Sequence, residues 1–183
     1  LLKTFNKIRD FEYLQPSQLK PSILMRYMNS IYLMANRGEH ELMLLYFADE
    51  LATIATTKDD SEARGFICAK LYELDASLAA MLGMPHIATS IRNEVFMIQN
   101  SSEYEKTKND FENLTKMAQE DAEAYLEKLA NDLGAILCEY GFNVEINYRV
   151  KSLWSIYHKI TKENSEYKSI DDLRDLLAIR IIL

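Results

Sequence analysis

The chain has 183 residues, of which 48% are apolar and 27% are charged, and its net charge is −7. This composition is ordinary for a globular protein and excludes collagen-like, low-complexity and wholly disordered classes. With only five Gly and three Pro, the chain is expected to be mainly α-helical. The acidic balance and the lack of an apolar run near the roughly 20 residues of a membrane span predict no membrane partner and no sequence-specific nucleic-acid partner.

The two ends and the cysteines indicate the setting of the chain. It begins at Leu1 rather than at a Met and stops at Leu183 inside an apolar run, so we expect a piece of a longer protein. Neither Cys68 nor Cys138 has another Cys or a His at metal-ligand spacing. Both are expected to be buried, reduced thiols, and the expected location is the cytoplasm.

Residues 1–105 show the apolar spacing of helices throughout. The third helix should close at Gly83, because Gly is common just past a helix end, and Pro85 lies beyond it as a stop. The expected helices are 23–34, 39–54, 62–82 and 85–99.

Residues 106–140 should be a connecting region formed by one long helix over 109–140, ended by Gly141. From there the pattern alternates, which predicts a strand over 142–149, followed by a helix over 150–163. The Ile-rich run 176–183 predicts a second strand that is covered on both faces. The expected fold is therefore mainly α, an incomplete helical region followed by the first strand–helix–strand of an α/β domain over 141–183.

Charge is distributed unevenly along the chain. Residues 149–183 hold seven Lys/Arg and five Asp/Glu, a net charge of +2, which leaves −9 for the other 148 residues. Lys151, Ser155 and Lys159 are spaced i, i+4, i+8 and would form one ridge on a helix, with Arg149 at its start. Such a ridge suits a triphosphate, although the same spacing occurs on solvated helices.

Asp175 stands directly before the second apolar strand. A carboxylate at a strand end facing a row of cations is typical of magnesium–nucleotide sites, where the acid holds the metal and the bases hold phosphates. A turn or strand-edge acid is the alternative. Arg180, within the strand, is expected to be an ion-pair partner or a neighbour of the nucleotide site.

The segments 148–159 and 170–183 resemble the start of the (p)ppGpp synthetase domain of the RelA/SpoT family. They share the pattern R-x-K-x-x-x-S-x-x-x-K and, after a loop, D-L-x-A-x-R. The segment 71–84 looks like the family's helix after its hydrolase core. At the position of Tyr148 the family usually has Gly.

The resemblance implies a nucleotidyltransferase-like domain that transfers pyrophosphate from ATP to the 3′-hydroxyl of GDP or GTP, the reaction of the stringent response. By position, Arg149 would contact the ATP purine, and Asp175 would hold magnesium. The ATP phosphates would be bound by Lys151, Ser155 and Lys159. The family's general base would lie beyond Leu183, so this piece alone should not catalyse synthesis, and any ribosome contact would lie outside it.

The resemblance also implies that residues 1–105 are an incomplete or degenerate HD-type hydrolase region. The segment 46–53 resembles the family segment with a metal-binding Asp, which places Asp49 at that position and Thr53 where the family has Asn. The other expected ligands would lie upstream, so manganese is expected only if an intact site exists there. The histidines are expected at the surface or in satisfied core positions: His40, His86 and His158.

Two alternatives to a synthetase remain open from the sequence. One is a protein that acts mainly as a (p)ppGpp 3′-pyrophosphohydrolase. The other is a non-catalytic helical regulatory module whose basic helix meets an acidic partner.

Overall fold

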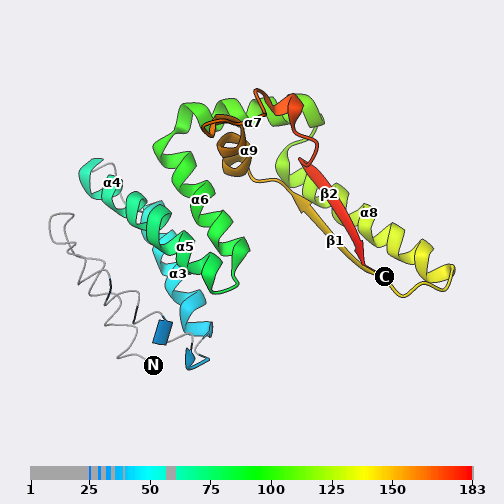
Figure 1. Cartoon of the computed structure of the whole chain (residues 1–183), viewed down its shortest axis with the longest axis horizontal. Coiled ribbons are helices and arrows are strands. Elements are labelled where there is room, and N and C mark those ends of the chain that lie inside the picture. The colour runs from blue at the N-terminus through cyan, green and yellow to red at the C-terminus, as the bar shows by residue number, and fades with distance from the viewer. Residues whose placement is uncertain are drawn as a thin grey trace. The chain divides into compact units, whose positions relative to one another are not determined.

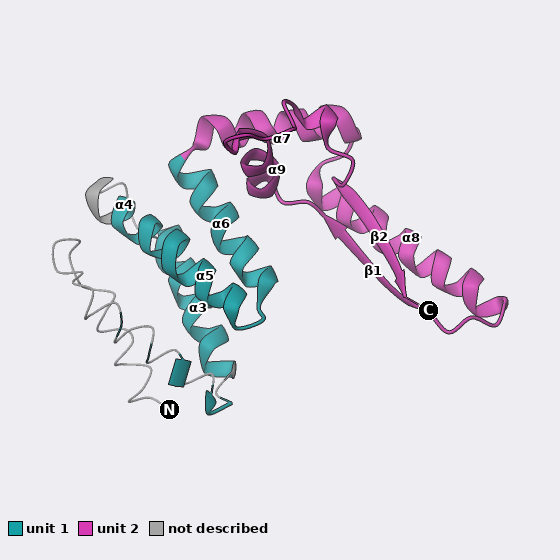
Figure 2. Cartoon of the chain, in the orientation of Figure 1, with its two compact units in different colours: residues 1–99 teal, residues 100–183 magenta. Residues whose placement is uncertain are grey.

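The computed structural model describes residues 40–56 and 61–182, together with residues 25, 29, 32–33 and 36–38. Most of the helix expected over 23–34 lies outside the described residues. The described part is mainly helical and contains one antiparallel sheet of two strands (Figure 1). None of its helices is both long enough and apolar enough to cross a membrane. The chain divides into two compact units, residues 1–99 and 100–183 (Figure 2).

The first unit is helical throughout its described part, which confirms the helices expected over 39–54, 62–82 and 85–99. A π-helical segment, Leu71–Asp75, lies within the middle stretch. The α-helices are α3 (His40–Thr56), α4 (Ser61–Lys70), α5 (Ala76–Met81) and α6 (Pro85–Gln99).

The end of α5 follows the prediction made from glycine and proline. Gly83 takes a left-handed conformation with φ +77°, which carries no Cβ penalty for Gly. Met84 N then donates to Ala79 O at 2.8 Å, closing the helix end, and Pro85 begins α6.

The core of the first unit contains a buried ionic cluster among its apolar side chains. The Lys70 ammonium forms an ion pair with Glu50 and lies 3.9 Å from Asp75 Oδ2. The Tyr46 hydroxyl donates to Asp75 Oδ1 at 3.2 Å. These charges are surrounded by buried apolar residues, among them Met43, Phe47, Ile54, Leu71 and Ile91.

The second unit holds four helical segments and both strands. Its elements are α7 (Ser101–Thr115), α8 (Gln119–Glu139), β1 (Glu145–Val150), α9 (Leu153–Thr161), a 3-10 turn (Ile170–Asp172) and β2 (Leu177–Ile182).

The single helix expected over 109–140 is wrong, because the chain breaks between α7 and α8. Lys116 adopts a left-handed conformation with φ 60°. The Thr115 hydroxyl donates to Phe111 O at 2.8 Å and accepts from Met117 N at 3.3 Å. These local hydrogen bonds end α7 at Thr115, although the apolar periodicity of the sequence continues past this point. The end of α8 at Gly141, with φ 83°, is as expected.

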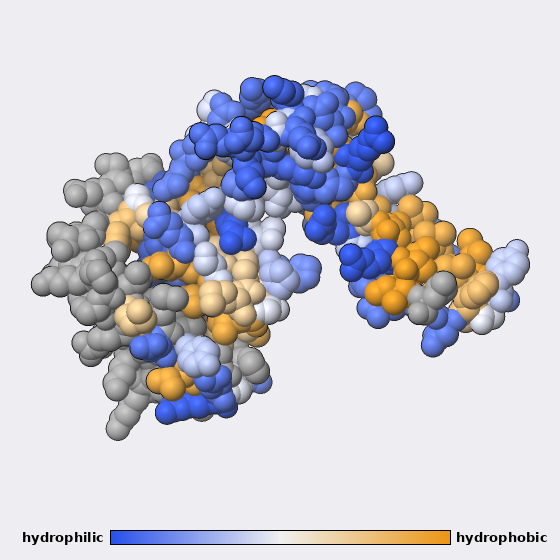
Figure 3. Space-filling model, viewed as in Figure 1, coloured by the Kyte–Doolittle hydropathy of each residue, from blue (hydrophilic) through white to orange (hydrophobic). Residues whose placement is uncertain are grey.

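The two strands pair in antiparallel register, with Ile146 opposite Ile181 and Arg149 opposite Ala178. They pack on α8, where Gly134 lies against Ile146. The expectation that the second strand is covered on both faces is wrong for the described chain: from Arg180 to Ile182 it is exposed. Apolar surface shows over this end of the sheet and α8 (Figure 3).

One of the two cysteines is buried as expected, and the other is exposed. Cys68 is fully buried, and burial raises the pKa of its thiol, an effect partly offset by the charge of Arg64. Cys138 is exposed near the end of α8, so the prediction of two buried thiols is wrong for this residue.

Candidate functional site

Three basic side chains converge on the carboxylate of Asp175, immediately before β2. Lys151 Nζ lies 2.7 Å from Oδ2, Lys159 Nζ lies 3.3 Å from Oδ1, and Arg149 Nη2 lies 3.9 Å from Oδ2. β1 positions the arginine, the turn after β1 positions Lys151, and the last turn of α9 positions Lys159. Segments far apart in the sequence thus bring four of the expected site residues together.

Lys151 does not lie on a helical ridge as its spacing predicted, because α9 begins only at Leu153. Its backbone is held instead by two hydrogen bonds. Lys151 N donates to Leu176 O at 2.8 Å, which continues the pairing of β1 with β2, and Gln119 Nε2 of α8 donates to Lys151 O at 2.9 Å. The side chain is buried, and its ion pair with Asp175 offsets the cost of removing the ammonium from water.

Ser155 lies in the first turn of α9, beside the residue that caps it. Ser152 Oγ accepts from Ser155 N at 3.3 Å and donates to Ser155 Oγ at 2.8 Å. This N-cap fixes the start of the helix. The Ser155 hydroxyl keeps its own proton available for an acceptor, and it lies on the same helix as Lys159, one turn earlier.

The electrostatics favour an ionised acid and an excess of positive charge. The hydrogen bond from Lys151 is the largest effect that lowers the pKa of Asp175, with smaller contributions from its charge and from Lys159, while desolvation opposes them. Three cations thus face one carboxylate. An anion entering here would meet two unneutralised positive charges.

Arg180 lies on the same face of the sheet as Arg149. The register places Arg149 opposite Ala178, and side chains two residues apart on a strand point to the same side. Tyr148 lies opposite Ile179 on the other face. The Tyr148 ring, at the position where the family usually has Gly, therefore lies on the sheet face opposite to Arg149 and Arg180.

The single tryptophan of the sequence lies on α9 next to Ser155. The Trp154 ring stacks on His158 with 4.9 Å between ring centroids. His158 and His86 are exposed, which confirms the surface positions expected of them, whereas the side chain of His40 lies outside what the structure describes.

The residues fit magnesium only as an ion that arrives with phosphates. Asp175 supplies one partly exposed carboxylate, and both its oxygens contact lysines. Across residues 40–56 and 61–182, no group of three or more His, Cys, Asp or Glu side chains could hold a metal. Mg²⁺ is commonly bound by one or two protein carboxylates together with substrate phosphates, and Asp175 matches that pattern.

Asp49, at the hydrolase-like position, is half-buried on α3. Among the described residues, no group of three or more His, Cys, Asp or Glu side chains that could hold a metal includes it. The manganese expected of an intact hydrolase site therefore has no ligand set in the described part of the chain.

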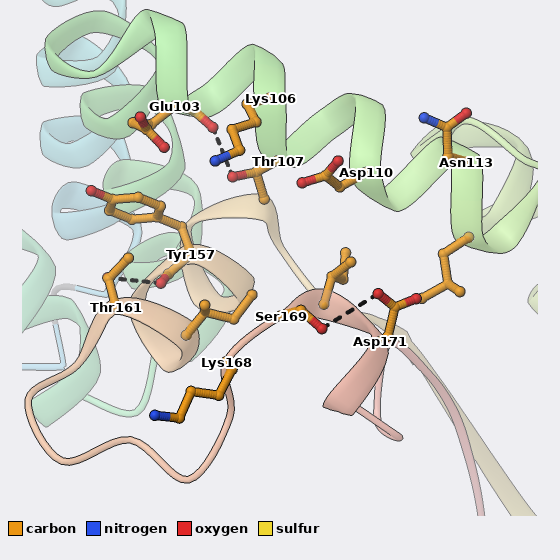
Figure 4. Close-up of a pocket in the computed structure, with 13 residues that line it drawn as sticks. Glu103, Lys106, Thr107, Asp110, Asn113, Tyr157, Thr161, Lys168, Ser169 and Asp171 are labelled. Carbon is orange, nitrogen blue, oxygen red and sulfur yellow. Dashed lines mark hydrogen bonds between the residues drawn. The ribbon is translucent and has the colours of Figure 1, made fainter.

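A polar pocket that the sequence did not indicate lies between α7, α9 and the 3-10 turn, with a volume of about 470 Å³ (Figure 4). Its charges are mixed, since Lys106 and Lys168 share its wall with Glu103, Asp110 and Asp171. Tyr157 and Thr161 line it from a face of α9 other than that of Ser155 and Lys159. The pocket is thus separate from the cation cluster.

Comparison with curated proteins finds relatives over most of the chain. It is 29% identical, over 82% of its length, to a guanosine-3′,5′-bis(diphosphate) 3′-pyrophosphohydrolase of Aquifex aeolicus (strain VF5). It is 27% identical over its whole length to a protein of the same name from Spiroplasma citri, and 26% identical over 82% of its length to the GTP pyrophosphokinase of Escherichia coli (strain K12). No family model matches the chain.

The matched regions are 21%, 23% and 19% of these relatives, so the chain spans about a fifth of their length. Their names include both a hydrolase and a pyrophosphokinase of guanine nucleotides. The resemblance seen in the sequence is confirmed: the curated homologues of this chain are RelA/SpoT-family proteins.

Proposed function

We propose that this chain supplies the ATP-binding half of a (p)ppGpp synthetase site, which transfers pyrophosphate from ATP to the 3′-hydroxyl of GDP or GTP. The observation that carries the proposal is the convergence of Lys151, Lys159 and Arg149 on Asp175. A cluster with two surplus positive charges is suited to a polyphosphate. The GTP pyrophosphokinase name of one relative agrees with this assignment.

When ATP binds, its phosphates would replace Asp175 as the ionic partner of the two lysines. Phosphate oxygens, which carry more charge than one carboxylate, would take the ammonium groups of Lys151 and Lys159, and Ser155 would donate its hydroxyl proton to a phosphate. The carboxylate of Asp175, released from the lysines, would hold the magnesium ion. When bound, magnesium neutralises phosphate charge and orients the phosphates.

The purine would lie along the sheet face that carries Arg149 and Arg180. A planar guanidinium stacks on aromatic rings, and two of them on one face offer a base two contacts. Phosphoryl-type transfer depends mainly on positioning and charge neutralisation, which these side chains provide. The acceptor nucleotide would be bound, and the general base supplied, by residues outside this chain, and the reaction would take place in the cytoplasm.

A hydrolase is the second candidate, favoured by the names of two relatives. It would remove the 3′-pyrophosphate of (p)ppGpp with manganese, and Asp49 would be one of its ligands. The cation cluster around Asp175 is what supports the synthetase, whereas Asp49 is a single carboxylate at the hydrolase-like position. Release of pyrophosphate from (p)ppGpp by the longer protein with manganese would instead support the hydrolase.

The proposal is tested by titrating the 183-residue chain with ATP, with magnesium or with EDTA. Calorimetry gives the affinity, and the fluorescence of Trp154, next to Ser155, reports binding at α9. Lys159→Ala should weaken binding at least tenfold, as for loss of a charge-assisted hydrogen bond worth about 1.5–3 kcal/mol. Lys128→Ala, which removes an exposed lysine of α8, is the matched control and should bind like the wild type.

Asp175→Asn separates the two roles of the acid. It frees the lysines, so binding of ATP in EDTA should become tighter than in the wild type, while the gain from magnesium should disappear. An unchanged magnesium effect would remove Asp175 from the metal site. A wild-type chain that binds no ATP under either condition would refute the nucleotide site and leave the non-catalytic helical module.

A further inference from the structure

The loop after α9 folds back onto the helix end through one serine. Ser165 N donates to Lys162 O at 3.0 Å, and Asn164 has φ 61°, which turns the chain. Ser165 Oγ donates to Lys159 O at 2.6 Å and accepts from Tyr167 N at 3.1 Å. The serine therefore ties Tyr167 to the backbone of Lys159.

This arrangement places the Tyr167 ring over a cation of the site. Lys159 Nζ lies 4.5 Å from the ring centroid, within the range of a cation–π interaction. The same ammonium lies 3.3 Å from Asp175 Oδ1. Lys159 therefore has two partners, one anionic and one aromatic, and the ring is half-buried.

The two lysines of the site, Lys151 and Lys159, differ in how strongly the surrounding structure restrains their side chains. The Lys151 side chain is 10% exposed, and both its backbone N–H and its backbone carbonyl form hydrogen bonds. The Lys159 side chain is 34% exposed and sits at the end of a helix, where a free lysine would sample many rotamers. Lys159 is thus the cation that gains more from a further restraint.

We propose that Tyr167 is a positioning residue that holds the Lys159 ammonium in place for the incoming triphosphate, an inference that rests on the proposed nucleotide site. An arriving phosphate competes with Asp175 for the lysine, because both are anions. The neutral ring does not compete, since it attracts the ammonium through its π face. Tyr167 therefore still restrains Lys159 after the carboxylate has been released.

The test compares Tyr167→Phe with Tyr167→Leu in the 183-residue chain. Phe keeps the π face and should keep the affinity for MgATP, whereas Leu should weaken it about two- to fivefold, the range of a partly exposed cation–π contact. Tyr140→Leu, which removes an exposed ring at the end of α8, is the matched control and should not change the affinity. Circular dichroism checks that each variant is folded.

A second readout does not need the nucleotide. The protons next to the Lys159 ammonium should show an upfield ring-current shift in NMR spectra of lysine-labelled protein, assigned with Lys159→Arg. The shift should persist in Tyr167→Phe and vanish in Tyr167→Leu. Its absence in the wild type, equal affinities for Leu and wild type, or equal losses for Phe and Leu would each overturn the proposal. If the shift is present but the wild type binds no ATP, the nucleotide site fails while the restraint on Lys159 stands.

Discussion

The ammonium of Lys151 lies 2.7 Å from an oxygen of Asp175, although 24 positions separate the two residues in the chain. The contact forms because Lys151 N pairs with Leu176 O, which brings the end of β1 alongside the start of β2. The strand pairing thus positions the acid–base pair directly. The chemistry of the site depends on the register of a two-stranded sheet.

Removing Lys151 should weaken nucleotide binding. Lys151→Ala leaves Asp175 with Lys159 and the more distant Arg149, so MgATP binding should weaken about tenfold to a hundredfold, as for a lost charge-assisted hydrogen bond. Isothermal titration calorimetry measures this. A loss of less than twofold, with Lys128→Ala as the control, would contradict a phosphate contact at Lys151.

The acid stability of the second unit should depend on Asp175. The lysines lower the pKa of its carboxyl, so its contribution to the free energy of unfolding is full above the ordinary Asp value of about 3.9 and is lost as the pH falls through the folded-state value. Asp175→Asn should therefore lose less stability than the wild type between pH 7 and pH 3, measured by urea unfolding.

Part of this acid response should remain in Asp175→Asn. The backbone N–H groups of Lys168 and Ser169 lower the pKa of Asp172 as well, and this carboxyl titrates in both proteins. If wild type and Asp175→Asn lose stability in parallel as the pH falls, the ion pairs around Asp175 do not contribute to folding in solution.

The helix ends marked by glycine could be predicted from the sequence, because Gly83 and Gly141 both adopt positive φ. The break at Lys116 could not, since a lysine in the left-handed conformation carries no local signal and the apolar stripe continues past it. The start of α9 was missed despite a usable signal. Ser152 directly before the apolar Leu153 is typical of an N-cap and predicts a helix start beyond Lys151.

The charged residues of the site could be selected from their types and spacing, but not their partners. That Lys151 and Lys159 share one carboxylate depends on strand pairing. The contributions of Gln119 and Tyr167 depend on hydrogen bonds and ring packing between segments that no periodicity connects. Such contacts become visible only when the chain is folded.

Gln119 should support nucleotide binding without touching the nucleotide. Its amide donates to Lys151 O, and one neutral hydrogen bond is worth about 0.5–1.5 kcal/mol, so losing this restraint in Gln119→Ala should weaken MgATP binding by up to about tenfold. Gln119→Glu should be no better, because a carboxylate cannot donate to a carbonyl. Gln99→Ala, at the exposed end of α6, is the control, and calorimetry would contradict the role if all three variants bind alike.

The buried ionic cluster of the first unit should be required for folding. Lys70→Met leaves the carboxylates of Glu50 and Asp75 without the charge of their ammonium partner, and breaking a buried pair costs about 3–5 kcal/mol. Urea unfolding should show this loss for Lys70→Met, while Glu50→Gln combined with Lys70→Met should recover part of it. Equal stability of Lys70→Met and the wild type would show that the pair contributes nothing net.

The arginines on the sheet face should distinguish a nucleotide from a bare polyphosphate. Arg180 is placed along β2 on the side of Arg149, beyond the lysines that would bind the phosphates. Arg180→Ala should therefore weaken ATP binding about two- to fivefold, the worth of one partly exposed cation–π contact, and leave tripolyphosphate binding unchanged. Lys159→Ala should weaken both ligands alike. Calorimetry with the two ligands makes the comparison, and an equal loss for both in Arg180→Ala would place this arginine at the phosphates rather than at the base.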